Sequence, residues 1–169
     1  MRFFFQKGTL TGISLISFAD ADYVSRSTDR RSVSGEVVMC AAGPVSWHSK
    51  TQMCLTSSTT QAEYVALSDM GKEILFLRQV WCFMLPKDKM PCIAIYEDNE
   101  GAIHIAKHPI SNSNSQRMDV RHHFLRELVE RKEIEIIHVE SQYQHADVLT
   151  KALPEREFEF QRGIVMNLM

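Results

Sequence analysis

The pattern of apolar and polar positions predicts strands first and helices afterwards. Residues 13–23, ISLISFADADY, form an apolar, β-branched run that ends in Asp20 and Asp22, as expected for a strand buried on both faces. Two further strands are predicted over 35–43 and 44–52, with a Gly-Pro bend between them. Short connections between successive strands indicate an antiparallel meander.

A long helix follows the meander. Ser58 and Gln61 have the spacing of a capping box, so the helix is expected to start there. From residue 63 to residue 81, inward positions recur at alternating four- and three-residue spacing, and all except Glu63 are apolar. A carboxylate on an inward stripe must be paired, protonated or metal-bound. Glu63 is therefore the most informative residue of this helix.

The second half of the chain predicts helices that alternate with short strands. The order indicates a mixed sheet, in which the meander is extended by strands added through helical crossovers. The predicted elements are a buried strand (92–97), a short helix ending near Pro109, an amphipathic helix (119–133), an alternating strand (133–141), a helix (142–153) opened by a second capping box at Ser141 and Gln144, and a C-terminal helix (154–169).

Four carboxylates stand where such folds build their sites. Asp20 and Asp98 end predicted strands, at the sheet edge where α/β proteins bind ligands, and Asp147 lies early in a helix. Taken singly, Asp20 could begin a turn, Asp98 could cap the next helix, and Asp147 could be a favourable first-turn charge. If the three converge with Glu63, mutual repulsion raises their pKa values unless cations offset it. Oxygen-only ligands suit Mg²⁺ or Mn²⁺, and two such ions on the order of 4 Å apart support phosphodiester hydrolysis.

Composition narrows the class of protein. The 169 residues fit one domain, and 44% hydrophobic with 24% charged residues is a globular balance. A net charge of −2 gives no overall positive field that attracts nucleic acid. Binding of nucleic acid would therefore need a local basic patch or another domain. The four cysteines lack zinc-type spacing and are predicted to be reduced core thiols of an intracellular protein. The apolar run within the opening MRFFFQKGT is too short for the hydrophobic core of a signal peptide. No later stretch is expected to span a bilayer.

Several stretches occur in a fixed order along the chain: ADADY, DRRSVSG, VSWHSKTQ, SSTTQAEYVALS, KEILFLR, YEDNEGAIHIAKHP, DVRHHFLRE and QHADVLTKAL. In this order and at these spacings, they resemble the ribonuclease H domain of copia-type LTR retrotransposon polyproteins, from about residue 10 to about residue 162. The first residues resemble the end of the reverse transcriptase segment that precedes this domain. The resemblance thus implies an upstream tail at 1–10 and a single ribonuclease H-like domain at 11–169.

The resemblance also implies a fold, an activity and a site. The fold is an α/β ribonuclease H-like fold with a mixed five-stranded sheet flanked by helices, and the activity is hydrolysis of the RNA strand of RNA–DNA hybrids during reverse transcription. The metal-binding acids fall on Asp20, Glu63, Asp98 and Asp147, with two Mg²⁺ ions, or Mn²⁺, as cofactors. The implied partners are the hybrid and the reverse transcriptase domain of the same polyprotein. The implied location is the cytoplasm, including virus-like particles.

Other side chains near these motifs are candidates for supporting roles. His145, two residues before Asp147, is a candidate proton shuttle, with a surface histidine on a helix as the alternative. Glu36 stands where the family commonly has an aromatic residue. Basic and small polar residues are candidates for contacts with nucleic acid: Arg30, Arg31, Lys50, Ser58, Asn99, Arg117 and Arg121.

Two other functions compete with hybrid cleavage. A catalytically inert relic would at most bind nucleic acid, but such a copy has no physical reason to keep a costly carboxylate at Glu63. A transposase or integrase nuclease core shares the fold and the metal chemistry, but it usually needs three acids rather than four.

Overall fold

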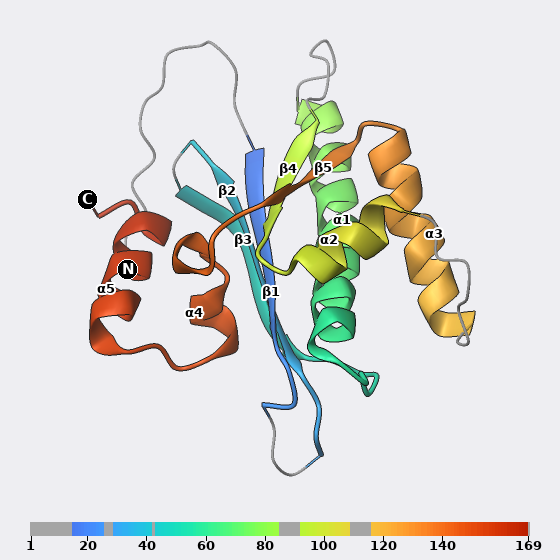
Figure 1. The fold of residues 1–169 in the computed structure, drawn as a ribbon. Helices are drawn as coiled ribbons and strands as arrows, with labels where there is room; N and C mark the ends of the chain where they lie inside the picture. Colours follow the sequence, from blue (N-terminus) through green and yellow to red (C-terminus); the bar gives the residue numbers. More distant parts are fainter. Residues whose placement is uncertain (1–14, 26–28, 42, 85–91, 109–115, 169) are drawn as a thin grey trace.

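The computed structural model describes residues 15–25, 29–41, 43–84, 92–108 and 116–168, with the backbone alone at 116–120 and 122. A single sheet is flanked by helices on both faces (Figure 1). The strands are β1 (Leu15–Asp22), β2 (Val33–Cys40), β3 (Gly43–Thr51), β4 (Ile93–Glu97) and β5 (Ile134–His138). The helices are α1 (Thr59–Met84), α2 (Glu100–Lys107), α3 (Gln116–Glu130), α4 (Asp147–Thr150) and α5 (Glu155–Val165), and a 3₁₀ turn covers Ser141–Tyr143.

The sheet has five strands in the order β3-β2-β1-β4-β5. β1 pairs antiparallel with β2, and β2 with β3, which forms the predicted meander. β4 lies parallel to β1, and β5 lies parallel to β4. The predicted mixed sheet is therefore confirmed, with β1 at its centre.

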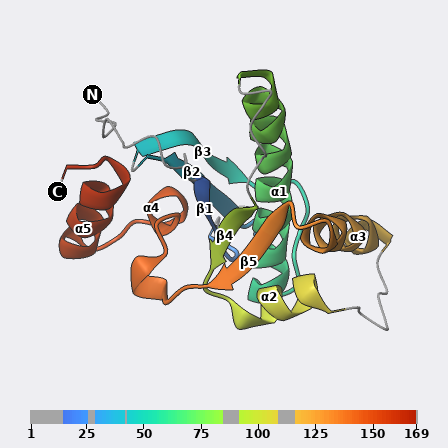
Figure 2. The same cartoon turned by 90° about the horizontal axis from the view of Figure 1, so that it is seen from above.

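Helices α1, α2 and α3 cover one face of the sheet, and α4 and α5 lie on the other (Figures 1 and 2). The first face holds the larger core, in which Leu67, Met70 and Ile74 of α1 are fully buried against the sheet. Each such side chain contributes about 1.5–3 kcal/mol by leaving water. The inward stripe predicted for α1 is confirmed. A smaller core on the second face joins Phe18 of β1 to Ala146, next to α4.

The predicted start of α1 is also confirmed. Ser58 Oγ accepts the backbone N–H of Gln61 at 3.2 Å. The Gln61 side chain reaches back to accept the N–H of Ser57, one residue earlier than an ideal capping box, at 2.9 Å. These bonds satisfy N–H groups that the first turn of a helix leaves without partners.

The helix predicted over 142–153 is wrong. A 3₁₀ turn over Ser141–Tyr143 and the single turn of α4 replace it. The side chains expected to form a capping box bond elsewhere, since Ser141 donates to Asp98 and Gln144 donates to the carbonyl of Ala19. Long-range partners thus displace the local capping that the spacing suggests.

Three predictions about the class of protein meet different outcomes. The four cysteines are free, but Cys82 and Cys92 are exposed, so their placement in the core is wrong. Cys82 lies near the exposed end of α1, and Cys92 precedes β4. No helix of the described residues is long and apolar enough to cross a membrane. The tail predicted at 1–10 lies outside the described residues.

Candidate active site

Three carboxylates from different elements meet at one edge of the sheet. Asp20 lies near the end of β1, Glu63 in the first turns of α1, and Asp98 directly after β4. One oxygen of each lies within 4.8 Å of the others. Because β1 and β4 are parallel neighbours, their carboxyl ends bring Asp20 and Asp98 to the same edge. Asp22, farther along β1 and half-buried, is outside this group.

Asp98 does not cap the helix that follows it. Asn99 is the N-cap of α2, and its side chain accepts the N–H of Ala102 at 2.9 Å. Asp98 Oδ2 instead accepts a hydrogen bond from Ser141 Oγ at 2.6 Å. The alternative interpretation of Asp98 as a helix cap is therefore wrong, and its carboxylate is oriented by the segment before α4.

The fourth acid, Asp147, opens α4 beside Asp20. It is 8% exposed and lies outside the 4.8 Å group. Thr150 connects the two acids, because its Oγ1 donates to Asp20 Oδ2 and also lies 3.1 Å from the carbonyl of Asp147. Lys151 Nζ lies 2.8 Å from Asp147 Oδ1. The structure thus gathers three predicted acids and places the fourth next to Asp20.

A glycine of β2 allows α4 to approach the sheet. A Cβ added at Gly35 would lie 2.6 Å from Thr150 Cγ2 and 2.8 Å from the carbonyl oxygen of Ala146. Real Cβ atoms essentially never approach so closely. Gly35 also lies opposite Asp20 in the β1–β2 pair. The absence of a side chain there sets the distance between Asp147 and β1.

Burial and mutual repulsion act on these acids together. Burial raises the pKa of Asp20, and Asp147 raises it further, while the hydrogen bond from Thr150 and the charge of Lys151 lower it. Burial also raises the pKa of Glu63, with Glu97 as the next cause and Asp20 after it. Glu63 Oε2 is buried and has no hydrogen-bond partner among the described residues. A backbone hydrogen bond from Ala21 to the Glu63 carboxyl opposes the rise in its pKa but does not cancel it.

Glu97 is a fifth carboxylate that sequence reasoning missed. It is fully buried at the end of β4, and its Oε1 accepts the backbone N–H of Asn99 at 3.1 Å. Burial raises its pKa well above the ordinary value. The signal was present in the sequence, because the period of two along β4 places Glu97 on the same face as Ile93 and Ile95.

His145 is half-buried in the turn before α4, between Phe18 of β1 and Gln161 of α5. Its ring centroid lies 4.5 Å from that of Phe18, and its Nδ1 lies 2.5 Å from Gln161 Oε1 on α5. Burial lowers the pKa of His145, and the bond to Gln161 opposes that shift. The alternative of a surface histidine on a helix is wrong as to the helix, since His145 lies in the turn before α4 and is half-buried. A proton-shuttle role stays a prediction.

Some residues predicted to contact nucleic acid lie close to the acids. Ser58 caps α1 and Asn99 caps α2, so both are neighbours of site-bearing turns. Arg30 and Arg31 are exposed after β1, and Arg31 Nε lies 3.7 Å from Asp29. Ser58 and Asn99 thus adjoin the turns that lead to Glu63 and follow Asp98, and the nucleic-acid roles of all four residues stay predictions.

Arg121 and Lys50, two other candidates for contacts with nucleic acid, bond to residues of the chain itself. Arg121 is half-buried, with Nη1 3.8 Å from Cys54 Sγ. Lys50 forms ion pairs within the sheet–α1 layer, 3.1 Å from Asp69. The side chain of Arg117 lies outside the described residues.

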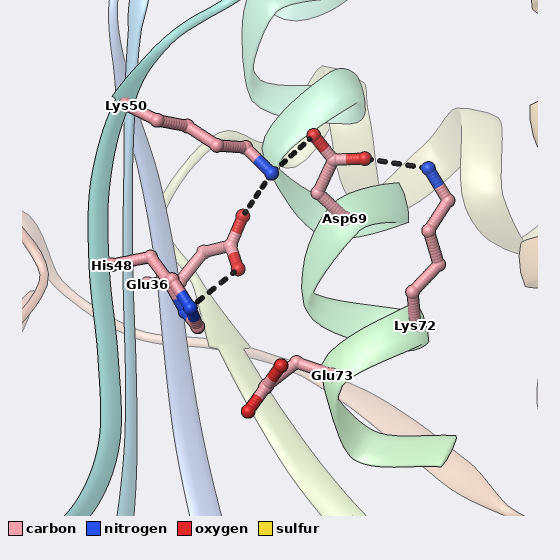
Figure 3. A pocket seen from close by; sticks show the side chains of 6 residues that line it. All are labelled: Glu36, His48, Lys50, Asp69, Lys72 and Glu73. Carbon is pink, nitrogen blue, oxygen red and sulfur yellow. Dashed lines mark hydrogen bonds and ion pairs between the residues drawn. The ribbon is translucent and has the colours of Figure 1, made fainter. Parts of the chain in front are cut away.

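A charged pocket separates the β2–β3 pair from α1, away from the acids (Figure 3). Its volume is about 230 Å³. Glu36, 3% exposed, faces His48 at 4.0 Å and Lys50 at 3.9 Å, and burial raises its pKa to about 7. The ion pair of Lys50 with Asp69 at 3.1 Å joins β3 to α1. The lining residues are Glu36, His48, Lys50, Asp69, Lys72 and Glu73.

Comparison with curated proteins identifies retrotransposon relatives. The chain is 31% identical over 151 residues to the Retrovirus-related Pol polyprotein from transposon TNT 1-94 of Nicotiana tabacum, a match covering 89% of this chain and 11% of the relative. The chain belongs to the copia-type transposon Pol polyprotein family. It spans about a tenth of the length of the curated relatives it matches. No family model matches the chain.

Solved structures with the same architecture include ribonucleases H. The RNase H1 of Halobacterium salinarum matches with a TM-score of 0.58 at 18% identity, covering 81% of this chain and 94% of that one. LC11-RNase H1 in complex with RNA/DNA hybrid matches with a TM-score of 0.57 at 13% identity, over the same shares of each chain. This Pol segment therefore has the predicted ribonuclease H-like fold.

Proposed function

We propose that this Pol segment is a Mg²⁺-dependent endonuclease that hydrolyses the RNA strand of RNA–DNA hybrids during retrotransposon reverse transcription. The observation that carries the proposal is the gathering of Asp20, Glu63 and Asp98 within 4.8 Å. Asp147 adds a further carboxylate beside Asp20. The family and the fold support the same activity, since a solved neighbour with this fold was crystallised on an RNA/DNA hybrid.

The residues present fit a hard divalent cation. The donors are carboxylate oxygens without thiolates or imidazoles, which suits Mg²⁺ or Mn²⁺. Glu63 Oε2 is buried without a hydrogen-bond partner among the described residues, as expected of an oxygen kept for a ligand. Asp20, Glu63 and Asp98 would hold one ion, and Asp20 with Asp147 a second. When bound, such ions lower the pKa of the attacking water and stabilise the leaving oxygen.

The chain orients three of the four carboxylates through side-chain contacts. Thr150 donates to Asp20, and Ser141 donates to Asp98. Lys151 pairs with Asp147. Groups that hydrogen-bond to metal-binding carboxylates fix their rotamers and so limit the reorganisation needed when a ligand arrives.

The hybrid is proposed to lie across this edge of the sheet. Ser58 and Asn99, beside Glu63 and Asp98, offer small polar groups for 2′-hydroxyls, and Arg30 and Arg31 offer charges for phosphates. The net charge of −2 predicts weak binding by the segment alone. The reverse transcriptase domain of the same polyprotein would add affinity. The proposed location is the cytoplasm, including virus-like particles.

A cleavage assay with three duplexes tests the proposal. End-labelled RNA–DNA hybrid, duplex DNA and duplex RNA are incubated with the chain in Mg²⁺, and again with EDTA. The expected result is cleavage of only the RNA strand of the hybrid, abolished by EDTA. Cleavage of duplex DNA would favour a transposase-type nuclease, and no cleavage of any duplex would favour an inert relic.

A further inference from the structure

Gln144 lies fully buried between the segments that carry the acids. Its side chain is 0% exposed. Nε2 donates to the carbonyl of Ala19 at 2.9 Å and lies 3.5 Å from the carbonyl of Tyr96. Ala19 immediately precedes Asp20, and Tyr96 lies two residues before Asp98. One amide group therefore contacts the backbone of both strands at their functional ends.

This contact stands where β1 and β4 separate. The last pair of their parallel ladder is Phe18 with Tyr96. Beyond it, the strands no longer bond to each other, and the two carbonyls need another donor. The two N–H groups of the Gln144 amide take that place, so the side chain continues the ladder for one more step.

The same residue sets the start of α4. The backbone carbonyl of Gln144 accepts the N–H of Asp147 at 3.2 Å. Its Oε1 accepts the N–H of Ala146 at 3.3 Å. The position of Asp147 is thus fixed from Gln144, which is itself anchored to β1 and β4.

We propose that Gln144 is a positioning residue that sets the spacing of Asp20, Asp98 and Asp147, and so the affinity of the site for divalent cations. The part of this inference that concerns cation binding rests on the proposed function, whereas the contacts of Gln144 do not depend on it. Outer residues that orient metal ligands typically change affinity or activity by ~10- to 100-fold when replaced. Glutamine suits the role because it offers two donors and one acceptor at the required reach.

Two substitutions at Gln144 distinguish the reach of its side chain from its hydrogen-bonding groups. Gln144→Asn keeps the amide but shortens its reach by one methylene, and Gln144→Leu keeps the bulk but removes every polar contact. Leu128→Ala is the matched control, because Leu128 is 3% exposed in the core on α3, on the opposite face of the sheet. It lowers stability at a position that packs near Gly71 of α1, eight residues beyond Glu63.

The direct readout is binding of Mn²⁺, followed by the electron paramagnetic resonance of the free ion. The full chain and both Gln144 variants, checked for folding by circular dichroism, are titrated together with the control. The expected result is a loss of ~10-fold or more in Mn²⁺ affinity for each folded Gln144 variant and none for the control. For hybrid cleavage in Mg²⁺, the Gln144 variants should have a lower kcat than wild type and the same KM.

The outcomes distinguish this inference from the proposed function. Unchanged Mn²⁺ affinity in Gln144→Asn, or an equal loss in the Leu128→Ala control, would overturn the positioning role even if the chain cleaves hybrid. A chain that cleaves no hybrid, but whose Mn²⁺ affinity falls in Gln144→Asn, would refute the nuclease and support the positioning role. A wild-type chain that binds no Mn²⁺ would overturn both.

Discussion

Lys151 Nζ lies 2.8 Å from Asp147 Oδ1, four residues along the chain and one turn away. Burial by itself would lower the pKa of Lys151, but Asp147, Asp20 and Asp98 together raise it. The ammonium therefore offsets part of the negative charge that accumulates where the acids meet. It also competes for Asp147 with any cation that the site binds.

Replacing this lysine should change how the chain responds to Mg²⁺. Lys151→Met leaves the acids without an internal cation, so we expect a lower melting temperature without metal and a larger rise on adding Mg²⁺ than in wild type. Differential scanning calorimetry with and without Mg²⁺ measures both. The control is Lys72→Met, which removes an ion pair of 2.7 Å with Asp69 away from the acids. Equal Mg²⁺ responses in all three chains would contradict the prediction.

Asp98→Asn should abolish cleavage without unfolding the chain. The amide can still accept the bond from Ser141, but it loses the charge that a divalent cation needs. Loss of several kcal/mol of transition-state stabilisation corresponds to a rate lowered by about 100-fold or more. Single-turnover cleavage of labelled hybrid measures the rate, and circular dichroism checks the fold. Cleavage by the variant at the wild-type rate would show that Asp98 takes no part in catalysis.

Glu36 should make stability depend on pH near neutrality. Its pKa is about 7 in the folded chain against 4.5 ordinarily, so the folded state binds more protons between these values. Stability therefore falls as pH rises through this window, by on the order of 3 kcal/mol at most. Glu36→Gln removes this dependence.

Urea unfolding of wild type and Glu36→Gln at a series of pH values measures the difference. We expect the free energy of unfolding of Glu36→Gln to rise relative to that of wild type from about pH 4.5 to about pH 7. Above about pH 7, the difference between the two free energies should stay constant. His48, Lys50 and Asp69 face the same pocket and are present in both chains. Glu135→Gln, at an exposed position of β5, is the control and should run parallel to wild type. A constant gap over the whole range would count against the buried position of Glu36.

Gly35→Ala should displace α4 from the sheet. The added Cβ would meet Thr150 and the carbonyl of Ala146 at less than 3.0 Å, so the turn that carries Asp147 must move. Overpacking of this kind costs about 1–3 kcal/mol, and hybrid cleavage should fall by ~10-fold or more. Gly71→Ala is the control, since it crowds Leu125 and Phe124 of α3, away from the acids. Equal losses of cleavage in both variants would indicate a general effect on stability.

Arg30 and Arg31 should contribute to hybrid binding through charge alone. Replacing both with serine is expected to weaken binding and to reduce the slope of log affinity against log salt by about 1 for each phosphate that an arginine neutralises. Fluorescence anisotropy with a labelled hybrid over a range of salt measures the slope. Arg131→Ser, at an exposed position in the turn after α3, is the control. An unchanged slope in the double variant would place the hybrid elsewhere.

The sequence predicted those parts of the site that depend on strand ends and helix faces. Asp20 and Asp98 end parallel neighbours, and Glu63 stands on an otherwise apolar stripe, so local periodicity marked these positions as candidates. The choice of Asp20 over Asp22 came from the resemblance to the family. The fold followed from the same periodicities, together with the order of the motifs.

Contacts between distant segments could not be predicted in this way. Ser141 and Gln144 have the spacing of a capping box, yet their partners, Asp98 and Ala19, lie 43 and 125 residues away. The contact of His145 with Phe18, 127 positions before it along the chain, likewise could not be read from the local pattern. A sequence pattern carries no information on which distant groups compete with a local hydrogen bond.

The bond from Thr150 to Asp20 joins residues 130 positions apart. Because α4 follows all five strands along the chain, the segment that completes the acids is synthesised after every strand of the sheet. Hydrolytic competence would thus arise only once translation has passed the last strand. A copy of the element with a premature stop between β5 and α4 would keep every strand of the sheet, yet it would lose Asp147, Thr150 and Lys151 together.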